Sequence, residues 1–329
     1  MIAGTPSLVT SVSRKHFVHA AAAAAASAAI VSGRAAFAQP APALTTATIG
    51  VFASPDMATL LYAKSQHAFE GAGIDLQLQN MGNGGATLAA AAGGSLQFGY
   101  ANTFTLIQAF QHGVPLRLVA PGAMYTSKAP TIKLLVAGDS TIQTGKDLIG
   151  KTIGTTQVGD ILGLSLAAWL AREGVDEASV HFFESPPNVM ISALQSHRVD
   201  AILSFDPFLT AAVAAGARPI GNPFDAIGDS FMAACWFSVL PWLTEHRAVA
   251  RNFASVMERS ASYVNGHYLE MVPMLADFSK IPATVLEKMA PSQSAPSITP
   301  GELQPLIDAA VKFHRIPGPV KARDIIFQG

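Results

Sequence analysis

Hydrophobic and polar positions along the chain follow two periods that alternate with each other. Short β-branched runs predict strands, and longer runs with an apolar residue every three or four positions predict helices. The first half is expected to contain strands at 48–52, 74–78, 96–100 and 116–120, with helices at 57–70, 86–92 and 103–111 between them. A strand–helix–strand order of this kind builds a parallel sheet with helices on both faces.

A second series of the same kind follows a strand predicted at 133–137. It is expected to contain strands at 152–155, 180–183 and 201–204, with helices at 161–173 and 189–196. Two series predict two α/β lobes, and a chain of 329 residues, half of them hydrophobic, is large enough for two cores. Proline and serine gather at 291–300, where we expect surface turns.

The first 38 residues have the pattern of an export signal. Arg14 and Lys15 supply positive charge, an alanine-rich apolar stretch covers 18–31, and small residues stand at the expected cleavage site, 36–38. The apolar stretch is shorter than the roughly 20 residues that span a bilayer. We therefore expect residues 1–38 to be removed, so that the mature protein is soluble in the periplasm.

The export route stays open between two pathways. Residues 13–17, Ser-Arg-Lys-His-Phe, resemble a twin-arginine signal in which lysine replaces the second arginine, and the general secretory route is the alternative. No cysteine stands at the cleavage site to carry a lipid anchor.

Composition and motifs exclude several classes of protein. The formal net charge of −1 argues against a nucleic-acid partner, which is normally met by a clustered basic face. Cys235 is the single cysteine and lies in the apolar run 233–237, so we interpret it as a buried hydrophobic residue. The nine histidines form no metal-binding motif and no serine lies in a nucleophile elbow, so we expect no metal, no cofactor and no catalytic residue.

Three groups of residues together resemble one protein family. They are DLIGKTIG at 147–154, which follows Asp-Ser-Thr-Ile at 139–142; Ala-Leu-Gln, Val-Asp-Ala and Asp-Pro-Phe at 193–195, 199–201 and 206–208; and 95–100 with 113–116. This pattern is similar to the periplasmic solute-binding proteins of the nitrate, sulfonate, taurine and thiamine-precursor group. The chain departs from the group's usual residues at three positions: Gln97 replaces aspartate, His197 replaces glycine and Asp206 replaces glutamate.

The resemblance implies a two-lobed periplasmic binding protein fold of type II. In such an α/β fold each lobe is a mostly parallel sheet with flanking helices, and the ligand lies in the cleft between the lobes. Lobe one would comprise 39–136 with 231–329, and lobe two would comprise 137–230.

The resemblance also implies a function without catalysis. The protein would capture a small organic molecule or anion, of sulfonate, carboxylate or pyrimidine type, for an ABC transporter permease and its ATPase, and would act as a monomer. Two alternatives stay open: a receptor that presents solute to a membrane sensor, and an enzyme like a pyrimidine-precursor synthase, whose cysteine-rich segment this chain lacks.

Ligands of open α/β sheets bind beyond the carboxyl ends of the strands. The residues that follow the predicted strands are therefore the candidates for ligand binding. In lobe one they are Ser54, Asp56, Asn83, Gly84, Tyr100, Asn102, Thr103 and Tyr125; in lobe two they are Thr155, Thr156, Gln157, Asp160, Asn188 and Asp206, to which Trp236 is added as an aromatic wall.

Several candidates have a structural alternative. Gly84 either exposes backbone N–H groups to an oxyanion or forms a tight turn, and Asp160 either contacts ligand or caps a helix. The aromatic candidates either line the cleft or belong to the core. No arginine is placed to fork a sulfonate, so an anion held by N–H and hydroxyl groups and an amine held by the aspartates both stay open.

Overall fold

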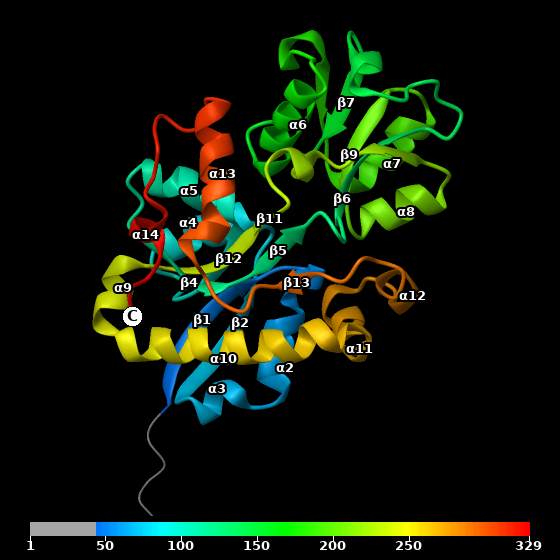
Figure 1. Ribbon diagram of the computed structural model, residues 1–329. Coiled ribbons are helices and arrows are strands. Elements are labelled where there is room, and N and C mark those ends of the chain that lie inside the picture. The colour runs from blue at the N-terminus through cyan, green and yellow to red at the C-terminus, as the bar shows by residue number, and fades with distance from the viewer. Residues whose placement is uncertain (1–43) are drawn as a thin grey trace, which may run out of the picture. The chain divides into compact units, whose positions relative to one another are not determined.

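The computed structural model describes residues 44–329, and the expected export signal with its cleavage site lies outside them. Two sheets form the centres of two α/β lobes (Figure 1). In lobe one, β1 (Thr45–Val51) pairs in parallel with β2 (Ile74–Asn80) and meets β3 (Gly99–Asn102) through a parallel bridge between Ile49 and Phe98. β12 (Ala234–Val239) lies between β3 and β4 (Leu116–Pro121) and is antiparallel to both.

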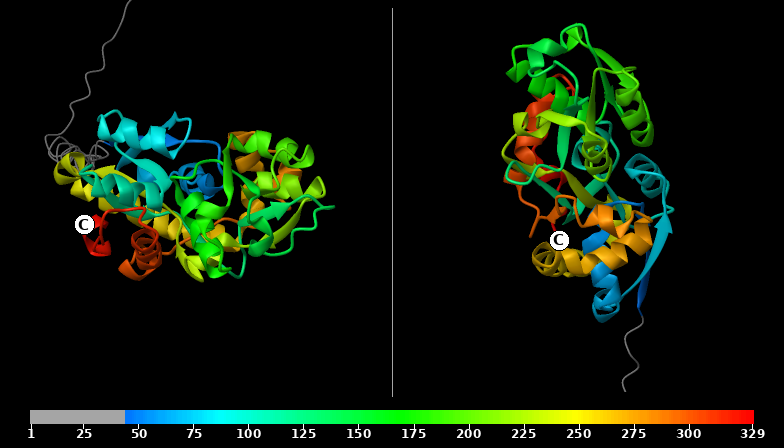
Figure 2. Two further views of the ribbon diagram at one scale, coloured as in Figure 1. Left: turned by 90° about the horizontal axis from the view of Figure 1, so that it is seen from above. Right: turned by 90° about the vertical axis from the view of Figure 1, so that its right-hand side faces the viewer.

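Helices surround the lobe-one sheet. Those that follow its first strands are η1 (Pro55–Met57), α2 (Ala58–Ser65), α3 (Ala68–Gly71), α4 (Gly84–Ala92) and α5 (Thr103–Gln111). The C-terminal part adds α9 (Leu240–Glu245), α10 (Arg247–Gly266), α11 (Tyr268–Ser279), α12 (Ala283–Leu286), α13 (Pro300–Lys312) and α14 (Ala322–Ile325). Helix α10 packs against α2 on this lobe, while α13 contacts both α5 and the lobe-two helix α6 (Figures 1 and 2).

Lobe two has one five-stranded sheet in the order β10-β6-β9-β7-β8. Its strands are β6 (Ile132–Val136), β7 (Thr152–Thr155), β8 (His181–Glu184), β9 (Ala201–Phe205) and β10 (Arg218–Gly221). Its helices are η2 (Gly145–Leu148), α6 (Ile161–Arg172), η3 (Glu177–Ser179), α7 (Pro187–Gln195), α8 (Phe208–Ala214) and η4 (Pro223–Ala226).

Each sheet contains one strand that runs against the others, β12 in lobe one and β6 in lobe two. Both are the first strand that the chain adds to a sheet after it arrives from the other lobe. The prediction of two lobes with mostly parallel sheets is therefore confirmed, and the exceptions mark the crossings.

Two short strands carry the chain between the lobes. β5 (Ala123–Thr126) leads out of lobe one, β11 (Ser230–Met232) leads back, and the two pair in antiparallel register. A third strand, β13 (Gln293–Ser294), pairs with the other side of β5. The prediction of surface turns at 291–300 is wrong for this part, because its backbone completes a three-stranded sheet and Ala295 beside it is only 1% exposed.

The expected lobe boundaries, at 136/137 and 230/231, remain predictions. The sheet to which each strand belongs suggests a different position for the first of them. β6 was assigned to lobe one by the boundary at 136, yet all five of its residues pair with β9 of lobe two. We therefore propose a boundary between β5 and β6. The return boundary at 230/231 falls within β11.

One predicted helix is divided in two in the structure. Residues 57–70 were expected to form a single helix, but it is divided because His67 has a φ of 52° and ends α2 before α3 begins. By contrast, the helix at 103–111 and the strand at 152–155 have the predicted bounds. Cys235 is fully buried, as expected for a hydrophobic residue.

No helix within residues 44–329 combines the length and the apolar character that a membrane crossing requires.

Gly122→Ala is expected to destabilise the protein by about 1–3 kcal/mol, because overpacking forces backbone to move. Gly122 joins β4 to β5, and a Cβ there would lie 2.4 Å from the carbonyl oxygen of Ala234. Gly71→Ala is the matched control, since its Cβ would meet no atom within 4 Å. Urea unfolding measures both; equal midpoints for the two variants would contradict the proposed close approach.

Candidate functional site

Four candidate residues cap the helices that follow the strands. Asn83, Asn102 and Asp160 each accept a hydrogen bond from a first-turn N–H of α4, α5 or α6, at 2.8–2.9 Å. Ser54 does the same for η1, at 3.2 Å. These side chains satisfy N–H groups that a helix start otherwise leaves without a partner. The interpretation of Asp160 as an N-cap is confirmed, while ligand contact by these four residues stays a prediction.

Gly84 begins α4 against the end of β3. A Cβ at this position would lie 3.0 Å from the Cα of Ala101, which is closer than nearly all real Cβ contacts. Close packing of α4 on the backbone of β3 therefore favours glycine at this position, and contact of its N–H group with an oxyanion stays a prediction.

Asp56 is the centre of a hydrogen-bonded group in lobe one. Tyr100 donates its hydroxyl to Oδ2 of Asp56 at 2.9 Å, and Ser292 donates its hydroxyl to Oδ1 at 2.5 Å. Burial raises the pKa of Tyr100 well above its usual value, and the Asp56 charge adds to this. The phenol therefore stays a hydrogen-bond donor, and both carboxylate oxygens of Asp56 are oriented by hydroxyl groups.

Ser292 was not predicted from the sequence. It lies 236 positions from Asp56, in the segment 290–294, which we call the C-terminal strap. Ser294 anchors the strap through two hydrogen bonds to Asn265, of 2.8 and 2.9 Å, and β13 pairs it with β5. One serine among several serines and prolines gives no local signal of this contact, because only the fold brings the strap to Asp56.

Asp206 extends the group into lobe two. Its Oδ1 accepts hydrogen bonds from the Thr210 backbone N–H at 3.0 Å and from the Thr210 hydroxyl at 2.6 Å. Burial raises the pKa of Asp206, against the opposing effects of Thr210, of the backbone N–H of Ala290 and of the Lys133 charge. Because Ala290 belongs to the C-terminal strap, this effect on the pKa of Asp206 in lobe two comes from the same segment that holds Asp56 of lobe one.

Tyr268 is a second buried phenol whose pKa responds to both carboxylates. Burial first, and then the charges of Asp206 and Asp56, raise its pKa to about 12. Its hydroxyl donates to the backbone carbonyl of Leu286 at 3.1 Å. The phenol was not among the predicted residues, and it comes from the C-terminal part that sequence reasoning treated as packing helices.

The loop after β7 holds the other lobe-two candidates. Thr155 is fully buried, and its hydroxyl has no hydrogen-bond partner among the described residues. The pKa of Asp160 is raised to about 6, chiefly by burial and also by the Glu184 charge, against the opposing effect of the Thr156 side chain. Gln157 is exposed. The loop approaches lobe one, because the Gln108 side chain of α5 donates to the carbonyl of Gly159 at 3.5 Å.

The remaining candidates are not gathered with these groups. Tyr125 is 1% exposed among the rings of Phe224 and Phe231, and it donates its hydroxyl to Asp225. It therefore belongs to the crossing strands. Asn188 is exposed on α7.

Thr103 and Trp236 belong to the lobe-one core. Thr103 is buried with its hydroxyl 3.4 Å from Sγ of Cys235. Trp236 is 1% exposed, with its ring 4.6 Å from that of Tyr100. Trp236 thus packs behind the Asp56 group, and core packing accounts for both residues.

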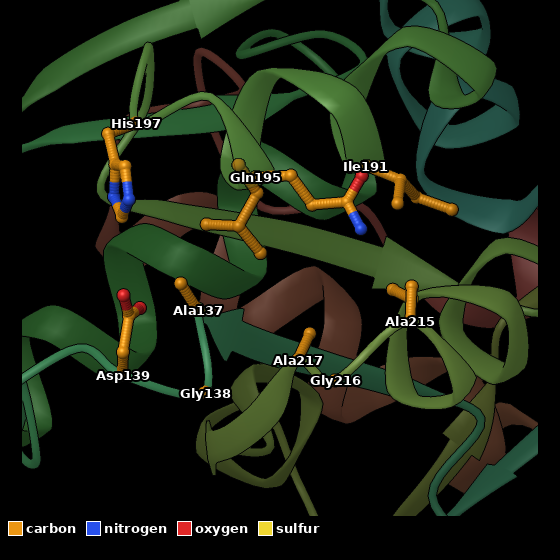
Figure 3. Close-up of a pocket in the computed structure, with 11 residues that line it drawn as sticks. Ala137, Gly138, Asp139, Ile191, Gln195, His197, Ala215, Gly216 and Ala217 are labelled. Carbon is orange, nitrogen blue, oxygen red and sulfur yellow. The ribbon is translucent and has the colours of Figure 1, made fainter.

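A separate cavity of about 270 Å³ lies in lobe two where α7 and α8 end (Figure 3). Asp139 and His197 stand at its rim with Gln195, and none of the predicted residues lines it. A second pocket, of about 390 Å³, lies beside Arg117 and Arg247. Each is built from one lobe, whereas the group around Asp56 and Asp206 combines polar groups of both. We therefore take the latter as the candidate site.

Within residues 44–329, no cluster of histidine, cysteine and carboxylate side chains is arranged to hold a metal ion.

Known proteins share this architecture. The model of the family described as "NMT1/THI5 like" matches residues 54–267. The periplasmic aliphatic sulphonate-binding protein SsuA of Escherichia coli is 21% identical, with a TM-score of 0.73 over 86% of this chain and 92% of that one. The alkanesulfonate-binding SsuA of Xanthomonas axonopodis pv. citri, solved with MOPS, is 20% identical, with a TM-score of 0.69 over 88% and 99%.

Solved structures of an enzyme also share this fold. The desulfurization enzyme DSZB is 15% identical, with a TM-score of 0.64 over 85% of this chain and 96% of that one. No curated protein matches the chain. At these identities the solved structures establish the shared fold, and the roles of individual residues have to be argued from this chain.

Asp160→Asn is expected to remove a pH dependence from the free energy of unfolding. Because the pKa of Asp160 is raised from 3.8 to about 6, the folded state binds this proton more tightly than the unfolded chain does. Its stabilising contribution is complete below about pH 4 and is lost as the pH rises through about 6. At about 1.36 kcal/mol per pKa unit, the loss by pH 7 is at most about 3 kcal/mol.

Urea unfolding of both proteins between about pH 4 and 7 measures this difference, and asparagine preserves the cap. Asp147→Asn is the control of opposite sign, since backbone N–H groups of Gln143 and Thr144 lower the pKa of Asp147. Its effect should stay nearly constant over this range. Parallel pH profiles for wild type and Asp160→Asn would contradict the assignment.

Proposed function

The chain belongs to the NMT1/THI5-like family, and on this premise we propose that it is a solute-binding protein that holds one small molecule between its two lobes. The observation that carries the proposal is the group around Asp56 and Asp206. The C-terminal strap donates the Ser292 hydroxyl to Asp56 of lobe one, and its Ala290 backbone N–H acts on the pKa of Asp206 of lobe two. Binding between lobes is a general means by which a ligand shifts an open–closed equilibrium, because it contacts both lobes only when they are closed.

The residues proposed to contact the solute come from strand ends of both lobes. Lobe one contributes Asp56 and Tyr100, and lobe two contributes Thr156 and Asp206. Beside Thr156, at the end of β7, Thr155 has a fully buried hydroxyl with no hydrogen-bond partner among the described residues. Ser292 orients Asp56.

Binding without turnover is favoured over an enzyme by the state of the cysteine. Cys235 is fully buried, and burial raises its pKa to about 12. Nucleophilic cysteines depend on a lowered pKa and on access to substrate, and Cys235 has neither property.

The proposed partner is an ABC transporter permease with its ATPase, and the proposed location is the periplasm. The support comes from the E. coli and Xanthomonas structures, which are sulfonate-binding proteins, and from the export-signal pattern of residues 1–38. The permease would recognise the closed, ligand-bound arrangement through the outer surfaces of the two lobes.

The site is tested with variants in opposite lobes. A thermal-shift screen of sulfonates, carboxylates, pyrimidines and amines identifies a ligand, and calorimetry then measures its affinity. Tyr100→Phe and Thr156→Ala should each weaken binding roughly ten- to a hundredfold, because one buried partner is lost at about 1–3 kcal/mol. Gln195→Ala, in the separate α7–α8 cavity, should leave the affinity unchanged. Loss of binding in Gln195→Ala alone would place the ligand in that cavity instead.

Export is tested by mass spectrometry of the protein released by osmotic shock. The mature chain should begin at Gln39, after the small residues at 36–38. Replacing Ala38 with a bulky residue should slow cleavage and leave the longer form in the membrane fraction. A functional released protein that keeps residues 1–38 would refute the expected processing.

A further inference from the structure

The second pocket, of about 390 Å³, belongs to lobe one and includes none of the candidate-site residues. We call it the arginine pocket. Backbone hydrogen bonds join the segments that line it. The N–H of Leu240, the first residue of α9, donates to the carbonyl of Pro115 at 2.6 Å, and the N–H of Phe327 donates to the carbonyl of Leu118 at 2.9 Å. Both acceptors flank Arg117 in sequence, so α9 and the residues after α14 are held beside β4.

Three arginines from three elements line the arginine pocket. Arg117 comes from β4, Arg247 from the first turn of α10, and Arg323 from α14 (Figure 1). Asp324 is the one acidic side chain among the lining residues. Within residues 44–329, none of these four side chains forms an ion pair. Three positive charges less one negative charge leave the lining with a formal charge of +2.

Two of the guanidinium groups are held in place by their surroundings. Arg247 donates from Nη2 to the carbonyl of Gln328 at 2.7 Å, and its guanidinium lies 5.9 Å from the centre of the Phe327 ring. Arg117 donates from Nη1 to the carbonyl of the preceding residue at 2.7 Å and lies 5.5 Å from the Phe110 ring. A guanidinium has five N–H donors, so each keeps further donors for a ligand. Like charges gathered without a counter-charge repel one another, and a bound anion relieves this repulsion.

The remaining lining of the arginine pocket is largely apolar. Leu240 is 38% exposed, Ile326 and Phe327 are half-buried, and Leu243 is fully buried. A ligand that reached the arginines would therefore also cover apolar surface. Cationic groups beside apolar side chains suit a ligand with an anionic group on an apolar body.

We propose that the arginine pocket binds a phosphomonoester with an apolar or aromatic body. A phosphomonoester carries a charge of about −1.5 to −2 at neutral pH, which matches the formal charge of the lining. Its oxygens accept paired hydrogen bonds from arginine. A sulfonate or a carboxylate has a single negative charge and would leave positive charge unbalanced. The same group occurs in free phosphorylated compounds and in the headgroup of phosphatidate lipids. This site is separate from the proposed solute site, and each can be tested without the other.

The charge requirement is tested with three probes that share one ring: phenyl phosphate, phenyl sulfate and phenol. At about pH 7.5 the second ionisation of a phosphomonoester is largely complete. Calorimetry at this pH should show that phenyl phosphate binds roughly tenfold or more tightly than either of the others. Added sodium chloride should weaken its binding. Inorganic phosphate should bind more weakly than phenyl phosphate, because it covers no apolar surface. Phenyl sulfate binding as tightly as phenyl phosphate overturns the proposal.

Variants locate the binding site. Arg323→Gln and Arg117→Gln should each weaken phenyl phosphate binding roughly tenfold or more, because each removes one charged donor. Arg323 is exposed, so its replacement should leave the melting temperature unchanged. Arg259→Gln is the matched control on α10, since Arg259 is also exposed but bonds Ser255 and does not line the pocket. Tyr100→Phe should also keep full affinity. Loss of binding in Tyr100→Phe, with full affinity in both arginine variants, would place the phosphate between the lobes and overturn the proposal.

Co-sedimentation with lipid vesicles distinguishes the two sources of the phosphate group. Phosphatidylcholine vesicles that contain phosphatidate, a phosphomonoester, are compared with vesicles that contain phosphatidylglycerol, a phosphodiester with one charge. Sedimentation with phosphatidate vesicles that Arg323→Gln abolishes identifies the lipid headgroup. Binding of phenyl phosphate without sedimentation identifies a free compound, and either result supports the proposed class. Equal sedimentation with both anionic vesicles, or no binding of phenyl phosphate or of phosphatidate vesicles, overturns it.

Discussion

The backbone ladder between β5 and β11 carries both passages of the chain between the lobes, and it consists of three pairs of residues. Thr126 faces Ser230, Tyr125 faces Phe231, and Met124 faces Met232. Aromatic packing around Tyr125 stiffens the ladder on one side. On the other side β13 adds a third strand, which continues as the C-terminal strap toward Asp56 and Asp206. Because one small sheet holds both the crossings and the strap, hinge geometry and site geometry are linked through backbone hydrogen bonds.

A second constraint is that every helix following a strand needs partners for its first N–H groups. Short polar side chains at the carboxyl ends of strands meet this need, and they are also the residue types that recognise ligands. This explains why the sequence predicted which loops surround the candidate site more readily than which residues belong to it. Asp160 and Asn102 were placed correctly at helix starts, yet their capping bonds account for them without a ligand. Asp56 and Asp206 differ, because hydroxyl groups orient the first and a backbone N–H of the other lobe acts on the pKa of the second.

The sequence predicted features that depend on local interactions and missed those that depend on contacts between residues far apart in the chain. Hydrophobic periodicity is local, so the order of strands and helices and the two-lobed class were accessible, and a family resemblance supplied the topology. The division of the helix at His67 depends on one residue in the left-handed region, which periodicity does not report. Ser292 and Tyr268 reach the site from more than 200 positions beyond Asp56, so no spacing rule nominated them. Tyr125 illustrates the converse limit, because a tyrosine at a strand end has the same sequence pattern whether it faces solvent, ligand or, as here, other rings.

The position of β12 has a consequence for the order in which the protein assembles during synthesis. Lobe two is an uninterrupted stretch of chain, and all of its strands lie between Ile132 and Gly221. Lobe one is divided, and its sheet lacks the strand between β3 and β4 until β12 has been made. Pairings that span this much sequence form slowly, and an unfilled gap leaves two strand edges exposed meanwhile. Lobe two can therefore complete its sheet before lobe one does, because lobe one needs β12. The C-terminal strap, which contains Ser292, is synthesised after the strands of both sheets.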